Sequence, residues 1–202
     1  MRIIAEHRKW LLTVFGALFL LTGTVSAYMT YRQSVHNGFT VGGNTIAVTE
    51  DYAPPEEMKA GENRYRKVVQ VRNTGTVPCY VRMFVGFSDG DVEDCSQLSA
   101  DGNLYYPIME YTDHLPKGWV YTSREEDPLN GGYYYYTEAV EPGQNTVPLF
   151  AMVSTRFKKA EDVRDYEIFI YGESVQVLDL DGVPFTGAEP WRQAWTQFLE
   201  RR

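Results

Sequence analysis

The feature that most constrains this chain is a series of short segments in which apolar or aromatic residues recur at every second position. Residues 79–88 show the pattern most clearly, because their large apolar side chains fall on one face of an extended backbone. The members of this face are Val81, Met83, Val85 and Phe87. The turn signal Asn73-Thr74-Gly75 precedes the segment. A period of two residues between turns is typical of a half-buried β-strand.

Further segments of this kind are separated by stretches rich in glycine, proline or acidic residues. We expect strands at residues 45–49, 66–73, 79–88, 108–112, 119–122, 133–139, 146–154 and 166–178. Residues 89–104 are expected to form an acidic loop, and residues 156–165 a short helix or a loop. Many short strands at this spacing predict an all-β fold, a jelly-roll-like antiparallel β-sandwich.

The last segment of the chain has a different period. Trp191, Trp195 and Phe198 lie at i, i+4 and i+7, which is one face of a helix. Pro190 suits the first turn of a helix. We therefore expect a short C-terminal amphipathic helix at residues 190–199, which either covers part of a sheet or contacts a partner.

The N-terminus has the pattern of a secretory signal peptide. A basic segment precedes the uncharged, mostly apolar residues 10–27, which end in Val25-Ser26-Ala27. Cleavage is expected between Ala27 and Tyr28, and an uncleaved membrane anchor is the alternative. The expected organisation is a signal-peptide helix at 1–27, an N-terminal arm with a possible donor strand at 28–63, and the sandwich with its helix at 64–202.

Charge and cysteine content limit the classes of function. The chain has 27 acidic and 19 basic residues, a formal net charge of −8, and its basic residues form no cluster. Nucleic-acid binding, which needs clustered Lys and Arg, is therefore not expected. Cys79 and Cys95 could form a disulfide in an exported protein, or remain separate thiols.

The sequence contains none of the short motifs that mark common catalytic or cofactor sites. HExxH, GxSxG, GxxxxGK[ST] and GxGxxG are all absent, and His36 and His114 are the only histidines after residue 27. We expect no catalytic residue, no metal ligand and no cofactor. The segment 89–94 packs four carboxylates into six residues, so it is either a solvated acidic loop or a calcium site.

Four consecutive tyrosines at residues 133–136 suggest a surface for a partner. Strand alternation places two of the four toward the core, so the other two are available for a surface role. The candidate partner surface consists of Tyr134, Tyr136, Trp191 and Trp195.

Two parts of the chain are similar to known protein classes. Residues 21–30, LTGTVSAYMT, resemble signal peptides that a SipW-type (ER-type) signal peptidase processes in Gram-positive bacteria. The body resembles the TasA/camelysin family of exported biofilm-matrix proteins in stretches that follow the expected order. These stretches are KVVQVRNTGTVPCYVR at 67–82, GYYYY at 132–136, VEPG at 140–143 with Thr146 and Leu149-Phe150, and YEIFIYGESVQ at 166–176.

The resemblance implies a jelly-roll-like sandwich and a structural or accessory role outside the cell, at the cell surface or in the biofilm matrix. It also implies self-assembly, in which the N-terminal segment of one copy completes the sheet of the next by β-strand addition. Here that donor would lie in residues 28–48. The implied partners are other copies or other matrix and cell-surface proteins, signal peptidase during export, and the membrane only through residues 1–27 before cleavage.

Two other functions stay open. One is a monomeric surface module for adhesion or ligand binding. The other is a secreted metallopeptidase, the activity to which camelysin-type members have been assigned. The absence of HExxH gives the metallopeptidase no support from the sequence.

Overall fold

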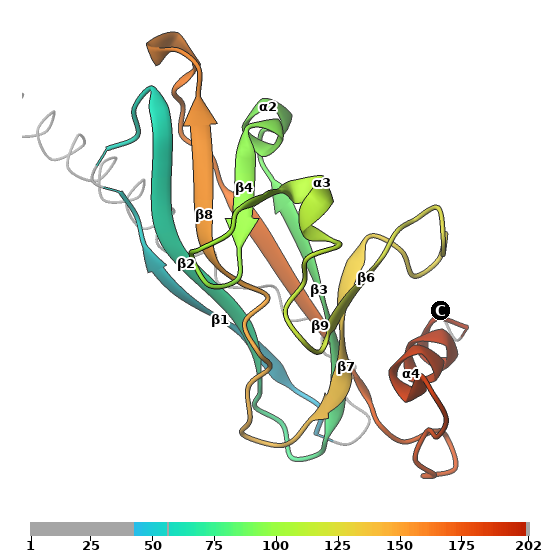
Figure 1. Ribbon diagram of the computed structural model, residues 1–202. Coiled ribbons are helices and arrows are strands. Elements are labelled where there is room, and N and C mark those ends of the chain that lie inside the picture. The colour runs from blue at the N-terminus through green and yellow to red at the C-terminus, as the bar shows by residue number, and fades with distance from the viewer. Residues whose placement is uncertain (1–42, 56, 201–202) are drawn as a thin grey trace, which may run out of the picture. The chain divides into compact units, whose positions relative to one another are not determined.

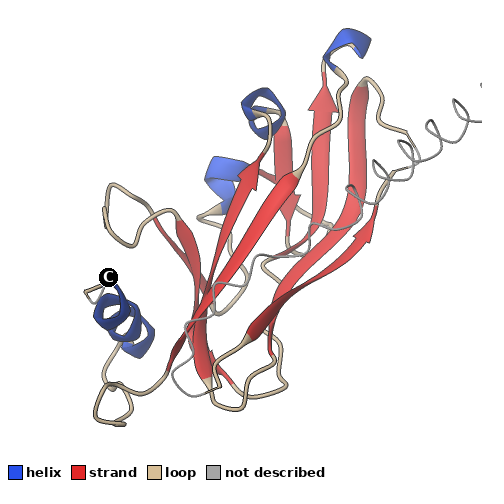
Figure 2. Ribbon diagram, turned by 180° about the vertical axis from the view of Figure 1, so that it is seen from behind, coloured by secondary structure: helices blue, strands red, loops and turns tan. Residues whose placement is uncertain are grey.

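The computed structural model describes residues 43–55 and 57–200, which form two antiparallel β-sheets packed face to face (Figure 1). The expected signal peptide, its cleavage site between Ala27 and Tyr28, and residues 28–42 of the arm lie outside the described residues. Strands are the main regular element of the described chain, and the helices are short (Figure 2). The prediction of an all-β sandwich is confirmed.

The two sheets differ in size but both are wholly antiparallel. Sheet A has five strands in the order β1 (Ile46–Ala53), β2 (Gly61–Asn73), β8 (Phe150–Phe157), β4 (Ser96–Ser99) and β5 (Tyr106–Pro107). Sheet B has four, in the order β6 (Trp119–Thr122), β7 (Tyr133–Val140), β3 (Cys79–Phe87) and β9 (Ile168–Gln176). The chain crosses between the sheets after β2, β3, β5, β7 and β8, as expected of a jelly-roll-like sandwich.

Alternation along the strands builds the core between the sheets. Val81 and Met83 of β3 are fully buried and face Val69 and Val71 of β2 within one apolar cluster. Asn73 closes this region at the end of β2: its side-chain amide donates to the carbonyl of Val140 at 2.7 Å. Buried backbone carbonyls need such partners, so the predicted turn at Asn73 also joins the two sheets.

The sandwich begins earlier in the chain than expected. β1 pairs with β2 from Ile46↔Asn73 to Ala53↔Arg66, and Gly61 is the first residue of β2. Residues 46–53 and 61–63 therefore belong to sheet A and not to a separate arm ending at residue 63. β1 joins the sandwich because its alternate apolar side chains, Ile46 and Val48, pack against the core.

Several local predictions were wrong in position or type. Residues 108–112 do not form a strand: α3 (Ile108–Tyr111) is a single helical turn. That turn brings Tyr111 into the core, where its hydroxyl donates to the carbonyl of Leu149 at 2.6 Å. The acidic segment 89–104 contains α2 (Gly90–Asp94) and β4, which were not predicted.

The strand expected at residues 146–154 is displaced toward the C-terminus. Thr146 and Leu149 donate their backbone N–H groups to the carbonyls of Val71 and Val69, at 2.8 and 2.7 Å. Pro148 between them has no N–H group, so the ladder is interrupted and the regular strand β8 starts only at Phe150. Downstream of β8, η1 (Ala160–Asp162) is one 3-10 turn within the predicted short helix or loop.

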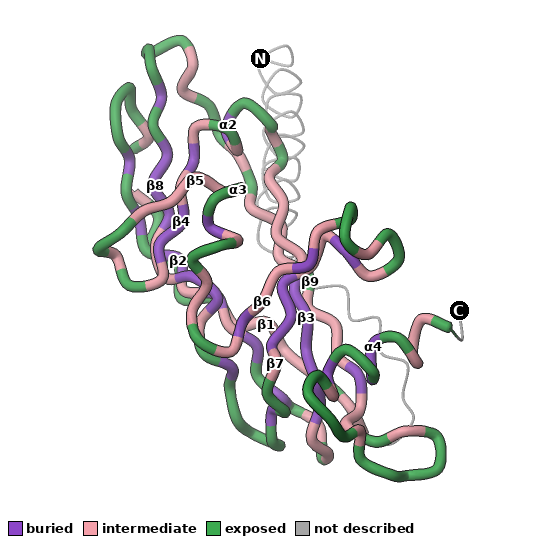
Figure 3. The backbone as a smooth tube through the Cα atoms, turned by 45° about the vertical axis from the view of Figure 1, so that its right-hand side comes forward, coloured by how far each residue is buried: buried purple, intermediate pink, exposed green. Residues whose placement is uncertain are grey.

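The C-terminal helix α4 (Pro190–Leu199) has the predicted bounds and covers the outer face of sheet B. Buried residues mark both this face and the side of α4 turned toward it (Figure 3). The two surfaces share a second apolar cluster. Its buried members are Tyr80, Tyr135, Val175, Trp191, Ala194 and Trp195.

Candidate functional site at the edge of the sandwich

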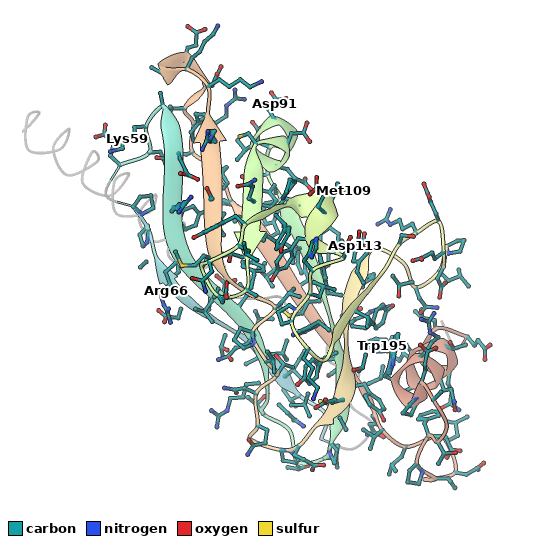
Figure 4. The ribbon with its side chains drawn as sticks, in the orientation of Figure 1. Lys59, Arg66, Asp91, Met109, Asp113 and Trp195 are labelled. Carbon is teal, nitrogen blue, oxygen red and sulfur yellow. The ribbon has the colours of Figure 1, made fainter. Side chains whose placement is uncertain are left out.

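The prediction that Tyr134, Tyr136, Trp191 and Trp195 form a surface for a partner is wrong, because all four side chains are buried. Tyr134 and Tyr136 of β7 point into the core between the sheets, with 5% and 7% of their surface exposed. Trp191 and Trp195 point from α4 onto sheet B and are 4% and 1% exposed; Trp195 is labelled in Figure 4. Alternation was the correct principle for β7, but Tyr133 and Tyr135 are the outward pair, and α4 covers Tyr135.

The buried face of α4 packs against a cation of sheet B, Arg82 of β3, through Trp195. The Arg82 guanidinium lies 4.0 Å from the ring centre of Tyr133 and 4.2 Å from that of Trp195. It donates to the Glu173 carboxylate at 2.7 Å and to the Tyr135 hydroxyl at 3.1 Å. A buried arginine with this many partners holds the helix to the sheet.

The disulfide considered between Cys79 and Cys95 is not formed. Cys79 and Cys95 are both free thiols. Cys79 begins β3, whereas Cys95 follows α2, beyond the other end of that strand. The nine residues of β3 extend about 26 Å, far more than the roughly 7 Å between Cα atoms that a disulfide permits.

Two carboxylates of residues 89–94 converge on a cation of the protein itself, the Arg164 guanidinium. Asp91, labelled in Figure 4, lies 3.8 Å from it. Asp89 pairs with it at 3.1 Å and also caps α2 by accepting the N–H of Val92 at 3.1 Å. Both contacts lower the pKa of Asp89. Across residues 43–55 and 57–200, no three His, Cys, Asp or Glu side chains gather as a metal site would require. His114 stacks on Tyr106, with ring centres 3.8 Å apart.

The most distinctive surface feature is the edge of the sandwich where β1 and β9 lie against each other. The two strands belong to opposite sheets, and each is the last strand of its sheet among the described residues. Gly172 of β9 has no side chain, and the side chains of Val48 and Ile46 from β1 lie over it. We call these two strands the β1/β9 edge.

A polar cluster around the buried Lys67 lies next to this edge on the inner face of sheet A. Lys67 of β2 has only 9% of its side chain exposed, forms an ion pair with Glu50, and lies 5.1 Å from the ring centre of Tyr52. A lysine is rarely so buried unless it is paired. This pair therefore fastens the second half of β1 to β2.

A chain of hydroxyl groups continues from this cluster across the sandwich. The Tyr65 hydroxyl lies 2.6 Å from that of Tyr166, which lies 2.7 Å from Thr155 Oγ1; the Ser96 hydroxyl follows at 2.8 Å. Burial raises the pKa of both tyrosines. Each hydroxyl has a hydrogen-bonding neighbour, so this chain joins the start of β9 to sheet A.

Sequence reasoning did not identify Lys67, Glu50 or Gly172 as important. Glycine in a strand does indicate a close approach of another segment, and a lysine in phase with buried residues of β2 is a second usable signal. The partners of both residues come from strands distant in the sequence, however, so the signals do not reveal the edge itself.

None of the helices within residues 43–55 and 57–200 is long and apolar enough to cross a membrane. Comparison of the chain with protein-family models and with curated proteins finds no match.

Proposed function

We propose that this protein is an exported structural or accessory component of the bacterial cell surface or biofilm matrix, and that it assembles by β-strand addition at the β1/β9 edge. The observation that carries the proposal is this edge, where two long strands from opposite sheets each end their sheet among the described residues. Unpaired backbone groups at a sheet edge are a ready template for another strand.

Strand β9 is the better acceptor of the two. Charged residues protect sheet edges from pairing. β1 carries two adjacent charged residues, Glu50 and Asp51, whereas β9 carries only Glu173. All three carboxylates form ion pairs within the chain, so the difference between the strands lies in the number of charges. Tyr171 of β9 is half exposed and could pack against an added strand.

The proposed donor is the segment immediately before β1. Residues 46–48 of the originally expected donor pair with β2 of their own chain, and the carbonyls of Gly43 and Thr45 accept the N–H groups of Thr76 and Thr74. The donor is therefore narrowed to residues 28–42. Two features of the sequence support the same proposal. The signal-peptide pattern supports export, and the resemblance to TasA/camelysin proteins supports assembly by β-strand addition.

The first test compares two proteins, one beginning at Tyr28 and one at Gly43. Gly43 is kept because its carbonyl accepts the N–H of Thr76 at 3.0 Å. We expect the longer protein to form fibres by electron microscopy and large species by sedimentation, and the shorter one to stay monomeric. Monomers from the longer protein at every concentration and salt tested would refute strand addition.

A pair of variants then tests the acceptor. Tyr171→Lys places a charge on β9, whereas Leu129→Lys places one on a loop residue that is 83% exposed. Both should leave the monomer stable, since substitutions at exposed sites usually cost little. Only Tyr171→Lys should reduce fibre formation; equal assembly by both variants would exclude β9 as the acceptor.

A monomeric adhesion module is the second candidate function. The turn between β9 and α4 exposes Leu178, Leu180 and Val183, which are 40%, 68% and 54% exposed. Clustered exposed apolar side chains often mark a contact site. Monomers that bind cells through this turn, and lose binding on Leu180→Ser, would favour this function over assembly.

A further inference from the structure

A small cavity lies between α4 and the connection from β6 to β7, residues 123–132. Its walls include Asn130 of the connection, Tyr135 of β7, and Trp191 and Trp195 of α4. The space is about the size of one water molecule. None of its lining residues belongs to the β1/β9 edge.

Two polar atoms of residues lining this cavity are buried without a hydrogen-bond partner among the described residues: Trp195 Nε1 and Asn130 Oδ1. Trp195 is 1% exposed. The orientation of the Asn130 amide is determined by Asp127, which accepts from its Nδ2 at 2.9 Å and from its backbone N–H at 3.0 Å. The atom left unpaired is therefore the amide oxygen.

We propose that this cavity binds one water molecule, which accepts the indole N–H of Trp195 and donates to Asn130 Oδ1. A buried donor or acceptor left unsatisfied is costly, and this pair needs a molecule that both accepts and donates. A cation could satisfy the oxygen but would face the positive end of the indole N–H bond, and an anion would face the amide oxygen. Water meets both needs and matches the space.

The bound water completes a hydrogen-bonded path from sheet B to α4. Arg82 bridges Glu173 and the Tyr135 hydroxyl, and that hydroxyl donates to the backbone carbonyl of Asn130 at 2.5 Å. Asn130 then reaches Trp195 through the water. Connected hydrogen bonds of this kind reinforce one another in a buried setting, so α4 is a fixed part of the sandwich.

Nuclear magnetic resonance of the ¹⁵N-labelled full-length protein tests the proposal. We expect a cross-peak between water and the indole proton of Trp195, assigned by its loss in Trp195→Phe. Trp119 is the matched control, because its indole N–H donates to the carbonyl of Val147 at 2.8 Å and should show no such cross-peak. Tyr135→Phe removes a hydroxyl proton that could relay the signal, and the cross-peak should persist in it.

A double-mutant cycle supplies a second, independent readout. In the full-length protein, Trp195→Phe keeps the ring but removes the donor, and Asn130→Ala removes the acceptor. If one water joins them, their effects on the unfolding equilibrium constant should be coupled by about fivefold, the size of one ordinary hydrogen bond. Additive effects, or a Trp195 indole proton without a water cross-peak, would overturn the proposal.

Discussion

Substitution of Gly172 by valine should break the contact between β1 and β9. A Cβ atom at this position would lie 2.8 Å from Val48 Cγ2 and 3.2 Å from Ile46 Cδ1. Carbon atoms prefer separations of about 3.5 Å or more, so the first contact alone is too short by about 0.7 Å. The two methyl groups of valine add further volume at the same place.

The expected cost follows from the surroundings of Gly172. Overpacking a well-filled site costs about 1–3 kcal/mol, and we expect about 2 kcal/mol here, because β1 is an edge strand that can move outward. Val48→Ala alone should cost about 1 kcal/mol for a half-buried side chain. The double variant should cost less than the sum by about 1 kcal/mol, since Val48→Ala vacates the space that the new side chain needs.

Urea unfolding followed by tryptophan fluorescence measures these differences. Gly90→Ala is the matched control, because a Cβ there meets no atom within 4 Å, and it should change stability by less than about 0.5 kcal/mol. Unchanged stability of Gly172→Val, or penalties of Gly172→Val and Val48→Ala that simply add, would refute the placement of β1 over Gly172.

Three further outcomes follow from the buried groups. Arg82→Ala should lower the free energy of unfolding by about 3 kcal/mol, because it leaves the partly buried Glu173 carboxylate unpaired; a loss below about 1 kcal/mol in urea titrations would contradict this. Alkylation of the native protein followed by mass spectrometry should modify Cys95 well before Cys79, because Cys79 is fully buried and burial raises its pKa to about 12; a disulfide-linked peptide would contradict the structure. Stability should fall as the pH rises above about 9, because burial raises the pKa of Cys79 and Tyr111, so that the unfolded chain loses these protons first; constant stability through this range would show that they are not buried.

Periodicity in the sequence was enough to predict the fold class and α4. The helix was placed correctly because its signal, the spacing of Trp191, Trp195 and Phe198, lies within three turns of one segment. The alternation in β3 is equally local, and it placed Val81 and Met83 on the buried face. In the structure β3 ends at Phe87, one residue before the predicted end.

Short elements were missed for a related reason. The four residues of β4 and the single turn of α3 are too brief to show a period. The helical turn that buries Tyr111 cannot be predicted from its own segment. The contact that stabilises this turn is a hydrogen bond to the carbonyl of Leu149, which is distant in the sequence. Pairing partners of this kind decide between helix and strand in such short segments.

The candidate sites depended on tertiary structure almost entirely. The sequence by itself determined that two of the tyrosines at 133–136 face each side of a strand and that Trp191 and Trp195 share a helix face. Only the packing of α4 on sheet B decided that both tryptophans are buried and that Trp195 lies against Arg82. The strand β3 likewise separates Cys79 from Cys95, and Gly172 meets Val48 only because the two sheets come together at one edge. A side-chain period records which residues share a face, whereas the neighbour of that face is set by long-range packing that no local pattern encodes.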